Sequence, residues 1–200
     1  MVVCESLPRF SSLLPAASRI LALDIGALKV GFAISAPARA GAGCAGAGCA
    51  GAGAAAPLVE GLGFVRAPPH VVGAPARAAY FAAVAAALAS RHGAGGALLG
   101  WPLLPTGAPG PSCAAVAAVR DALARAAPHL PLLLWDERGS SVAGRAALRA
   151  ARGGGPLPTE WRSGRVDEAA AMAILRSFLV ESAGRSGTAV AAARPYADVL

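Results

Sequence analysis

The positions of the hydrophobic residues divide the chain into short apolar runs and longer amphipathic segments. Runs of leucine, isoleucine and valine that are apolar throughout are typical of strands covered on both faces of a sheet. Segments whose apolar residues recur every three or four positions are typical of helices. The pattern predicts strands over residues 20–23, 28–35, 58–65, 97–102 and 130–135. It predicts helices over residues 75–91, 112–127, 140–151 and 166–180.

The order of these elements predicts an α/β fold with a mixed five-stranded sheet and helices on both faces. A tight turn near Gly26 joins the first two strands, so the first three strands are expected to form an antiparallel meander. The two later strands alternate with helices. In such a sheet the carboxyl ends of parallel strands meet at one edge, and functional sites form there.

The chain has 200 residues, which suggests a single domain, and the predicted elements place it over residues 19–180. Residues 1–18 carry little charge and several serines, which indicates either a targeting segment or a disordered start. Residues 36–57 form a Gly- and Ala-rich loop that is predicted to be flexible, and residues 181–200 a flexible tail. The loop formally matches a dinucleotide-binding Gly pattern, but the match arises from its repetitive composition.

The net charge of the chain indicates what kind of partner it binds. Lys and Arg total 18 against 11 Asp and Glu, a net charge of +7, and Lys29 is the single lysine. Such a basic excess fits a polyanion such as nucleic acid, although a biased coding composition explains the arginines equally well. No membrane partner is expected, because the long uncharged stretch consists of Gly and Ala. The four cysteines make no zinc-binding pattern.

Four acidic residues stand at the ends of predicted elements. Asp24 ends the first strand, Asp136 and Glu137 follow the last strand, and Asp167 begins the last helix. Each has an ordinary structural explanation. Asp24 can open the turn, the Asp136–Glu137 pair can be solvated, and Asp167 can favour the helix dipole.

Taken together, the acids suggest a metal centre. Three carboxylates at one sheet edge would repel one another unless cations lie between them. Carboxylate oxygens are the ligands that Mg²⁺ and Mn²⁺ prefer. A pair of such ions can hold the attacking and leaving oxygens of a phosphodiester, and this chemistry suits a basic surface.

Four segments in this order are similar to those of the YqgF/RuvX family of the ribonuclease-H-like superfamily. That family is described as Holliday-junction-resolvase-like and as pre-16S rRNA nucleases. The combination of Asp-Glu-Arg after an apolar strand with Asp-x-Ala-Ala at a helix start is the most specific part. The segments are Ile20–Gly26 with Val30–Ser35, Leu98–Leu103 with Gly107 and Gly110, Leu134–Arg138 with Ser140 and Ser141, and Val166–Ala170 with Ile174, Leu175, Phe178 and Leu179.

The resemblance implies a metal-dependent nuclease in which Asp24, Glu137 and Asp167 are the catalytic and metal-binding acids, with Asp136 as the alternative to Glu137. Mg²⁺ or Mn²⁺ would lower the pKa of a water that attacks a backbone phosphate in line. The loop at residues 102–111 and arginines between 145 and 165 would hold the nucleic acid. The implied substrate-binding residues are Lys29, Arg138, Arg149, Arg152, Arg162 and Arg165.

The chain departs from the family pattern at polar positions. Ala27 replaces the Thr that usually follows Asp-x-Gly in the family. Residues 103–107 stand where the family usually has a polar loop, and residues 139–141 stand where it usually has Leu-Thr-Thr. The acids are retained, which favours a nuclease acting on 16S-type precursor rRNA or branched DNA. The lost polar residues favour a nucleic-acid-binding ribosome-assembly factor with weak catalysis.

Two further expectations follow from the sequence. An Asp-x-Gly phosphate loop also occurs in sugar kinases and actin, but the chain lacks their second loop and second domain. The N-terminal extension and Gly-Ala insertion suggest a eukaryotic relative in the cytoplasm, a plastid or a mitochondrion. The protein is expected to be a monomer or a homodimer.

Overall fold

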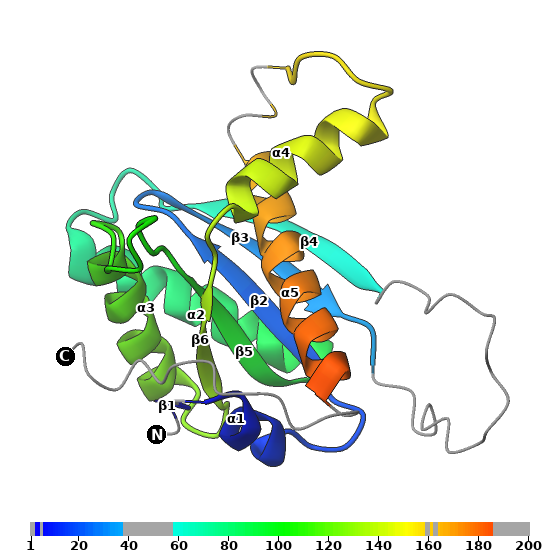
Figure 1. Ribbon diagram of the computed structural model, residues 1–200. Helices are drawn as coiled ribbons and strands as arrows, with labels where there is room; N and C mark the ends of the chain where they lie inside the picture. Colours follow the sequence, from blue (N-terminus) through cyan, green and yellow to red (C-terminus); the bar gives the residue numbers. More distant parts are fainter. Residues whose placement is uncertain (1–2, 5, 38–57, 159–160, 162–163, 186–200) are drawn as a thin grey trace, which may run out of the picture.

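The computed structural model describes residues 3–4, 6–37, 58–158, 161 and 164–185. They form a six-stranded sheet in the order β1-β6-β5-β2-β3-β4 (Figure 1). The strands are β1 (Val3–Cys4), β2 (Arg19–Ile25), β3 (Lys29–Ser35), β4 (Val59–Arg66), β5 (Ala94–Trp101) and β6 (Leu132–Asp136). The helices are α1 (Leu7–Leu13), α2 (Ala74–His92), α3 (Cys113–Ala126), α4 (Ser140–Ala151) and α5 (Arg165–Arg185).

The strand pairing confirms the mixed α/β sheet and the meander predicted from the sequence. Strand β3 pairs antiparallel with both β2 and β4, whereas β5 pairs parallel with β2 and β6. In register, Leu23 pairs with Leu99, and Leu99 pairs with Leu134. The next residue on each of these three parallel strands therefore lies in one row at the carboxyl end of the sheet.

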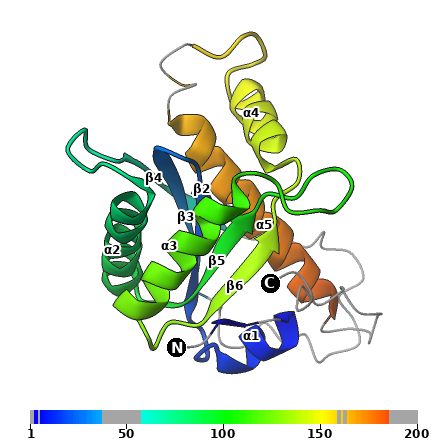
Figure 2. The same cartoon turned by 90° about the vertical axis from the view of Figure 1, so that its left-hand side faces the viewer.

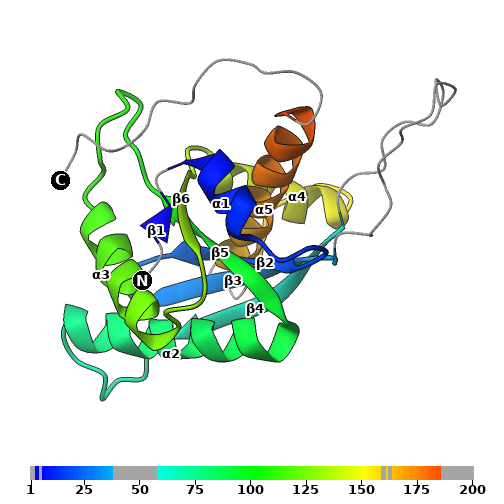
Figure 3. The same ribbon diagram turned by 90° about the horizontal axis from the view of Figure 1, so that it is seen from below.

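Two hydrophobic layers cover the sheet, as the sequence predicted. Helices α2 and α3 cover one face, and α1 and α5 cover the other (Figures 2 and 3). Along β2, Leu21 and Leu23 belong to the α2–α3 layer, and Ile20 and Ala22 belong to the α1–α5 layer. Because side chains alternate along a strand, Asp24 points toward α5.

The number of strands differs from the prediction. The sixth strand is β1, which pairs parallel with β6 through Val3 and Cys4. The next element, α1, buries Leu7 and Phe10 against the sheet. The described part of the N-terminal segment is therefore not a disordered start. A two-residue strand carries no periodicity, so its pattern could not reveal it.

Two element boundaries also differ from the predictions. Strand β5 begins at Ala94, because Gly93 in the left-handed region ends α2 at once. Helix α5 continues to Arg185, where a loose tail was expected. The remaining tail, residues 186–200, and most of the Gly-Ala loop, residues 38–57, lie outside the described residues. Among the helices described, none has the length and apolar character needed to cross a membrane.

Candidate active site

Asp24 lies near the carboxyl end of β2, on the face covered by α5. Gly31, on the neighbouring strand β3, pairs with Asp24. A Cβ atom at Gly31 would collide with the backbone of Asp167 and Glu168. The first turn of α5 therefore rests directly on β3 beside Asp24, and the missing side chain makes this contact possible.

Glu137 reaches the same place from the other side of β2. It follows β6 directly, and its backbone N–H donates a hydrogen bond to the Trp101 carbonyl at 3.3 Å. A Cβ atom at Gly100 would collide with the Glu137 carboxylate. Glu137 thus fills the space that Gly100 leaves. Its Oε2 atom is buried without a hydrogen-bond partner among the described residues.

Asp167 completes the group from the first turn of α5. Its Oδ2 atom lies 3.2 Å from the Lys29 ammonium nitrogen, and both side chains are about a quarter exposed (26% and 22%). The geometry of this contact is that of an ion pair and not of a good hydrogen bond. Residues from β2, from the end of β6 and from α5 therefore share one site.

Burial and mutual repulsion shift the pKa values of two of these acids. Burial, and then the Asp167 charge, raise the pKa of Asp24 from 3.8 to about 6, against a smaller opposing effect of Lys29. Burial, and then the Asp24 charge, raise the pKa of Glu137 from 4.5 to about 8. Interaction with the Asp24 side chain thus adds to the effect of burial on the pKa of Glu137. Since negative charge is disfavoured here, a cation would stabilise the ionised site.

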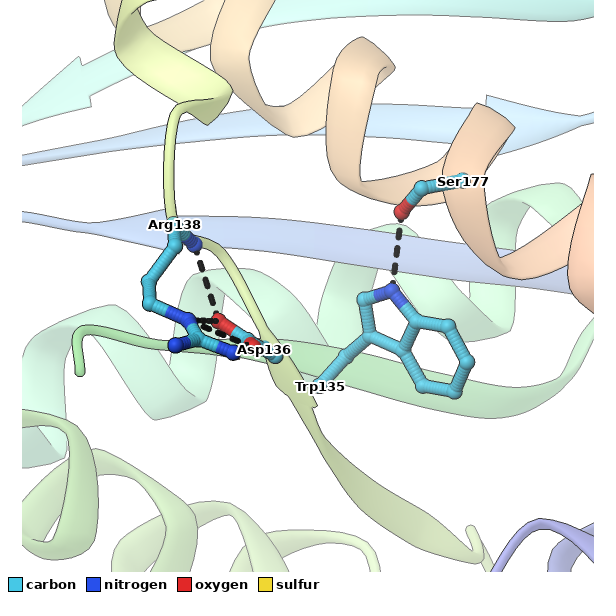
Figure 4. A network of polar contacts seen from close by, with 4 residues as sticks. All are labelled: Trp135, Asp136, Arg138 and Ser177. Carbon is cyan, nitrogen blue, oxygen red and sulfur yellow. Dashed lines mark hydrogen bonds and ion pairs between the residues drawn. The ribbon is translucent and has the colours of Figure 1, made fainter. Parts of the chain in front are cut away.

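Asp136 and Arg138 bind each other at the end of β6 (Figure 4). The Arg138 Nε donates to Asp136 Oδ2 at 2.8 Å, and Nη2 of Arg138 lies 2.6 Å from the same oxygen. The structure thus brings Glu137, and not its alternative Asp136, to Asp24. The neighbouring Trp135 ring donates a hydrogen bond to Ser177 Oγ at 2.8 Å, which ties the end of β6 to α5.

Of the other predicted substrate-binding residues, Lys29 lies in the acidic group. Arg149 lines a pocket of about 270 Å³ beside α4. Arg152 and Arg165 lie over the ring of Trp161. Arg162 lies outside the described residues.

Sequence reasoning missed Gly31, Gly100 and Glu168. A glycine inside a strand is a known signal of close approach, so the two glycines could have been noticed. The Glu168 carboxylate packs on Gly61 and accepts a hydrogen bond from the Gly63 N–H at 3.0 Å. That N–H lies at an irregularity in the β3–β4 register, which no sequence pattern revealed.

The donor chemistry of the site fits a divalent metal. Asp24, Glu137 and Asp167 offer carboxylate oxygens, and two of these, Glu137 Oε2 and Asp167 Oδ2, are buried without a hydrogen-bond partner among the described residues. Two glycines leave space around them. As the described side chains stand, no group of three or more His, Cys, Asp or Glu residues is already arranged around a metal position. The three acids therefore supply the kind of oxygen ligand that Mg²⁺ and Mn²⁺ prefer.

The sheet order, the covering helices and the acidic edge together define a ribonuclease-H-like α/β protein. The family model described as "RuvX: Holliday junction resolvase" matches residues 59–181, more than half of the chain. The chain therefore belongs to the RuvX family, as its motifs predicted. The match includes Glu137 and Asp167, whereas Asp24 precedes it.

Solved structures support the fold assignment. T. thermophilus RuvC in complex with Holliday junction substrate superposes with a TM-score of 0.50 at 16% sequence identity, over 82% of this chain and 96% of that one. A second T. thermophilus RuvC structure gives a TM-score of 0.50 at 15% identity, with the same coverage. No match was found among curated protein sequences.

Proposed function

We propose that this protein is a metal-dependent nuclease that hydrolyses phosphodiester bonds in structured nucleic acid. The observation that carries the proposal is the convergence of Asp24, Glu137 and Asp167, from three separate elements, at one partly buried position. Membership of the RuvX family supports the same class of activity. The two strands that flank β2 each carry a glycine at this place: Gly31 leaves room for the backbone at the start of α5, and Gly100 leaves room for the Glu137 carboxylate. Isolated structural acids would not require this space.

The protein's own groups have definable roles in this reaction. Bound Mg²⁺ or Mn²⁺ would supply an activated water and would stabilise charge on the phosphate. Asp24, Glu137 and Asp167 would hold the ions through their oxygens. Because its pKa is raised to about 8, Glu137 holds a proton at neutral pH in the metal-free site, and it would have to lose that proton to serve as a metal ligand. Lys29 orients the Asp167 carboxylate through the ion pair.

Two substrates are proposed. The first is precursor rRNA of the 16S type, which the YqgF/RuvX motifs suggest. The second is branched DNA, which is favoured by the description of the family as a Holliday junction resolvase and by the junction bound to the similar RuvC. The loss of polar residues at Ala27 and in the loop at 103–107 supports a third outcome, an assembly factor that binds RNA with weak catalysis.

A cleavage assay tests the proposal. The full chain is incubated with labelled precursor rRNA fragments, single-stranded RNA and a four-way DNA junction, in Mg²⁺, Mn²⁺ or EDTA. Asp24→Asn and Asp167→Asn are expected to lower the rate by about 100-fold or more. Asp121→Asn, on the exposed side of α3, is the matched control and should cleave normally.

Each outcome separates the candidates. Metal-dependent cleavage that both variants abolish supports the nuclease and identifies its substrate. Binding of RNA without cleavage by the wild type replaces the nuclease with the assembly factor. Cleavage that survives both substitutions contradicts the role of the three acids.

A further inference from the structure

Helix α4 and the loop after it project beyond the sheet (Figure 1). We call α4, residues 152–158, Trp161 and residues 164–166 the arginine arm. The arm carries four described arginines, and within residues 58–158, 161 and 164–185 none of them forms an ion pair with a carboxylate. These arginines are Arg145, Arg149, Arg152 and Arg165.

Two of the four are held by an aromatic ring. The guanidinium carbon of Arg165 lies 4.5 Å from the centre of the Trp161 ring, and that of Arg152 lies 5.1 Å from it. Such cation–π contacts restrict a long side chain while its N–H groups stay available to an anion. The ring therefore preorganises two guanidinium groups for phosphate.

The other two line one pocket. Arg145 and Arg149 are four residues apart on α4, so they lie on the same face of the helix. With Leu157 and Val166 they line the pocket of about 270 Å³. Like charges at this spacing destabilise a helix unless an anion lies between them. The two arginines therefore give this pocket a positively charged lining that an anion would neutralise.

The arm is fixed with respect to the acids. A Cβ atom at Gly144 would lie 2.9 Å from the backbone of Ala169 and Ala170, so α4 packs closely on α5. Arg165 precedes Asp167 by two residues in the first turn of α5, a helical rise of roughly 3 Å. A phosphate backbone bound along the arm would pass directly beside the acidic site.

We propose that the arginine arm is a sequence-independent binding site for the phosphate backbone of nucleic acid, and that it binds without metal. The proposal rests on the proposed nuclease function and adds the place where the substrate is held. Backbone contacts by arginine carry no sequence information, so the arm positions the strand and the acids act on it. Trp161 is the residue newly assigned to substrate binding, as the ring that holds Arg152 and Arg165.

Salt dependence of binding tests the site. Anisotropy of a labelled duplex is measured in EDTA, where no cleavage occurs, at several salt concentrations. The Arg152→Gln/Arg165→Gln double variant is expected to lower the slope of log affinity against log salt by about 2, because each lost phosphate contact lowers it by roughly 0.9. Arg77→Gln/Arg91→Gln, on α2 behind the opposite face of the sheet, is the control with the same net charge.

Equal loss of slope in the two double variants would overturn the proposal, because it would show an effect of net charge alone. Trp161→Leu keeps all four arginines and is expected to weaken binding about 2- to 5-fold, while unchanged affinity would exclude the ring's role. If the arm variant binds normally while the wild type still cleaves, the arm proposal fails and the nuclease stands. If the wild type binds no nucleic acid, both fail.

Discussion

Asp24 and Glu137 should make the stability of the metal-free protein depend on pH. Their pKa values rise on folding, from 3.8 to about 6 and from 4.5 to about 8, chiefly through burial. Between about pH 4 and 8 the folded state therefore holds more protons than the unfolded state. Stability is greatest at the acidic end and falls as pH rises, with a limiting slope of about 1.4 kcal/mol per pH unit for each proton.

Urea unfolding in EDTA from pH 5 to 8.5 measures this slope. Glu137→Gln cannot ionise, so its unfolding free energy should fall less at the upper end of the range. Asp121→Asn, whose carboxylate is exposed beside Arg120, should follow the wild type. Adding Mg²⁺ should stabilise the wild type most at high pH, because ions bind ionised carboxylates. A wild-type profile that rises toward pH 8 would contradict this account of the site.

Glu168 should position Asp167, its neighbour on α5. The Glu168 carboxylate accepts the Gly63 N–H at 3.0 Å and so fixes the start of the helix against β4. Glu168→Ala leaves that N–H without an acceptor and should cost about 1–2 kcal/mol in unfolding free energy, with reduced cleavage. Glu168→Gln keeps an acceptor oxygen and should restore most of both properties. Equal losses in the two variants would indicate that the charge matters and not the hydrogen bond.

At the scale of elements, substitutions at Gly31 and Gly100 should have different effects, one mainly on stability and the other mainly on Mg²⁺ binding. A methyl group at Gly31 meets the backbone of α5, which cannot move alone, whereas at Gly100 it meets the tip of the Glu137 side chain and the Ile174 methyl. Gly31→Ala should therefore cost about 1–3 kcal/mol through displacement of α5. Gly100→Ala should cost less stability and mainly weaken Mg²⁺ binding, because Glu137 is pushed aside.

Thermal unfolding with and without Mg²⁺ compares the two variants. Gly107→Ala is not a suitable control, because Gly107 has a φ of 85° and alanine there would be strained. The control is Ala79→Gly on the exposed side of α2, which removes a methyl group instead of adding one. It should lower the unfolding free energy by about 1 kcal/mol and leave Mg²⁺ affinity unchanged. Full Mg²⁺ affinity in Gly100→Ala would contradict the placement of Glu137.

The elements were predictable to different degrees for physical reasons. Strands β2, β5 and β6 are continuous apolar runs because both faces of the sheet are covered, and Asp24 and Glu137 stand at the ends of β2 and β6 as the pattern predicted. The choice between Asp136 and Glu137 depended on which carboxylate Arg138 binds, which is a property of the turn after β6. The role of Glu168 depended on the irregular pairing of β3 with β4. Contacts of this kind join distant segments and leave no local periodicity.

At the scale of the whole molecule, the N-terminal segment completes the core on the α5 side. Phe10 is fully buried and meets Phe178 edge to face at 5.8 Å, and Phe178 meets Trp135 at 5.2 Å. Trp135 comes two residues before Glu137, so this aromatic row runs from α1 to the acidic site. The segment is therefore expected to stabilise both the fold and the end of β6.

Phe10→Ala should accordingly lower the unfolding free energy by about 3–5 kcal/mol, since it removes a large side chain from a closed core. Ser11→Ala, exposed on the same helix, should change it by less than about 0.5 kcal/mol. Urea unfolding gives both values, and Trp fluorescence reports the combined surroundings of Trp101, Trp135 and Trp161. If Phe10→Ala proved as stable as Ser11→Ala, the segment with β1 and α1 would not contribute to the stability of the core. A large loss would mean that any processing that removes α1 also exposes Phe178 and loosens the strand end that carries Glu137.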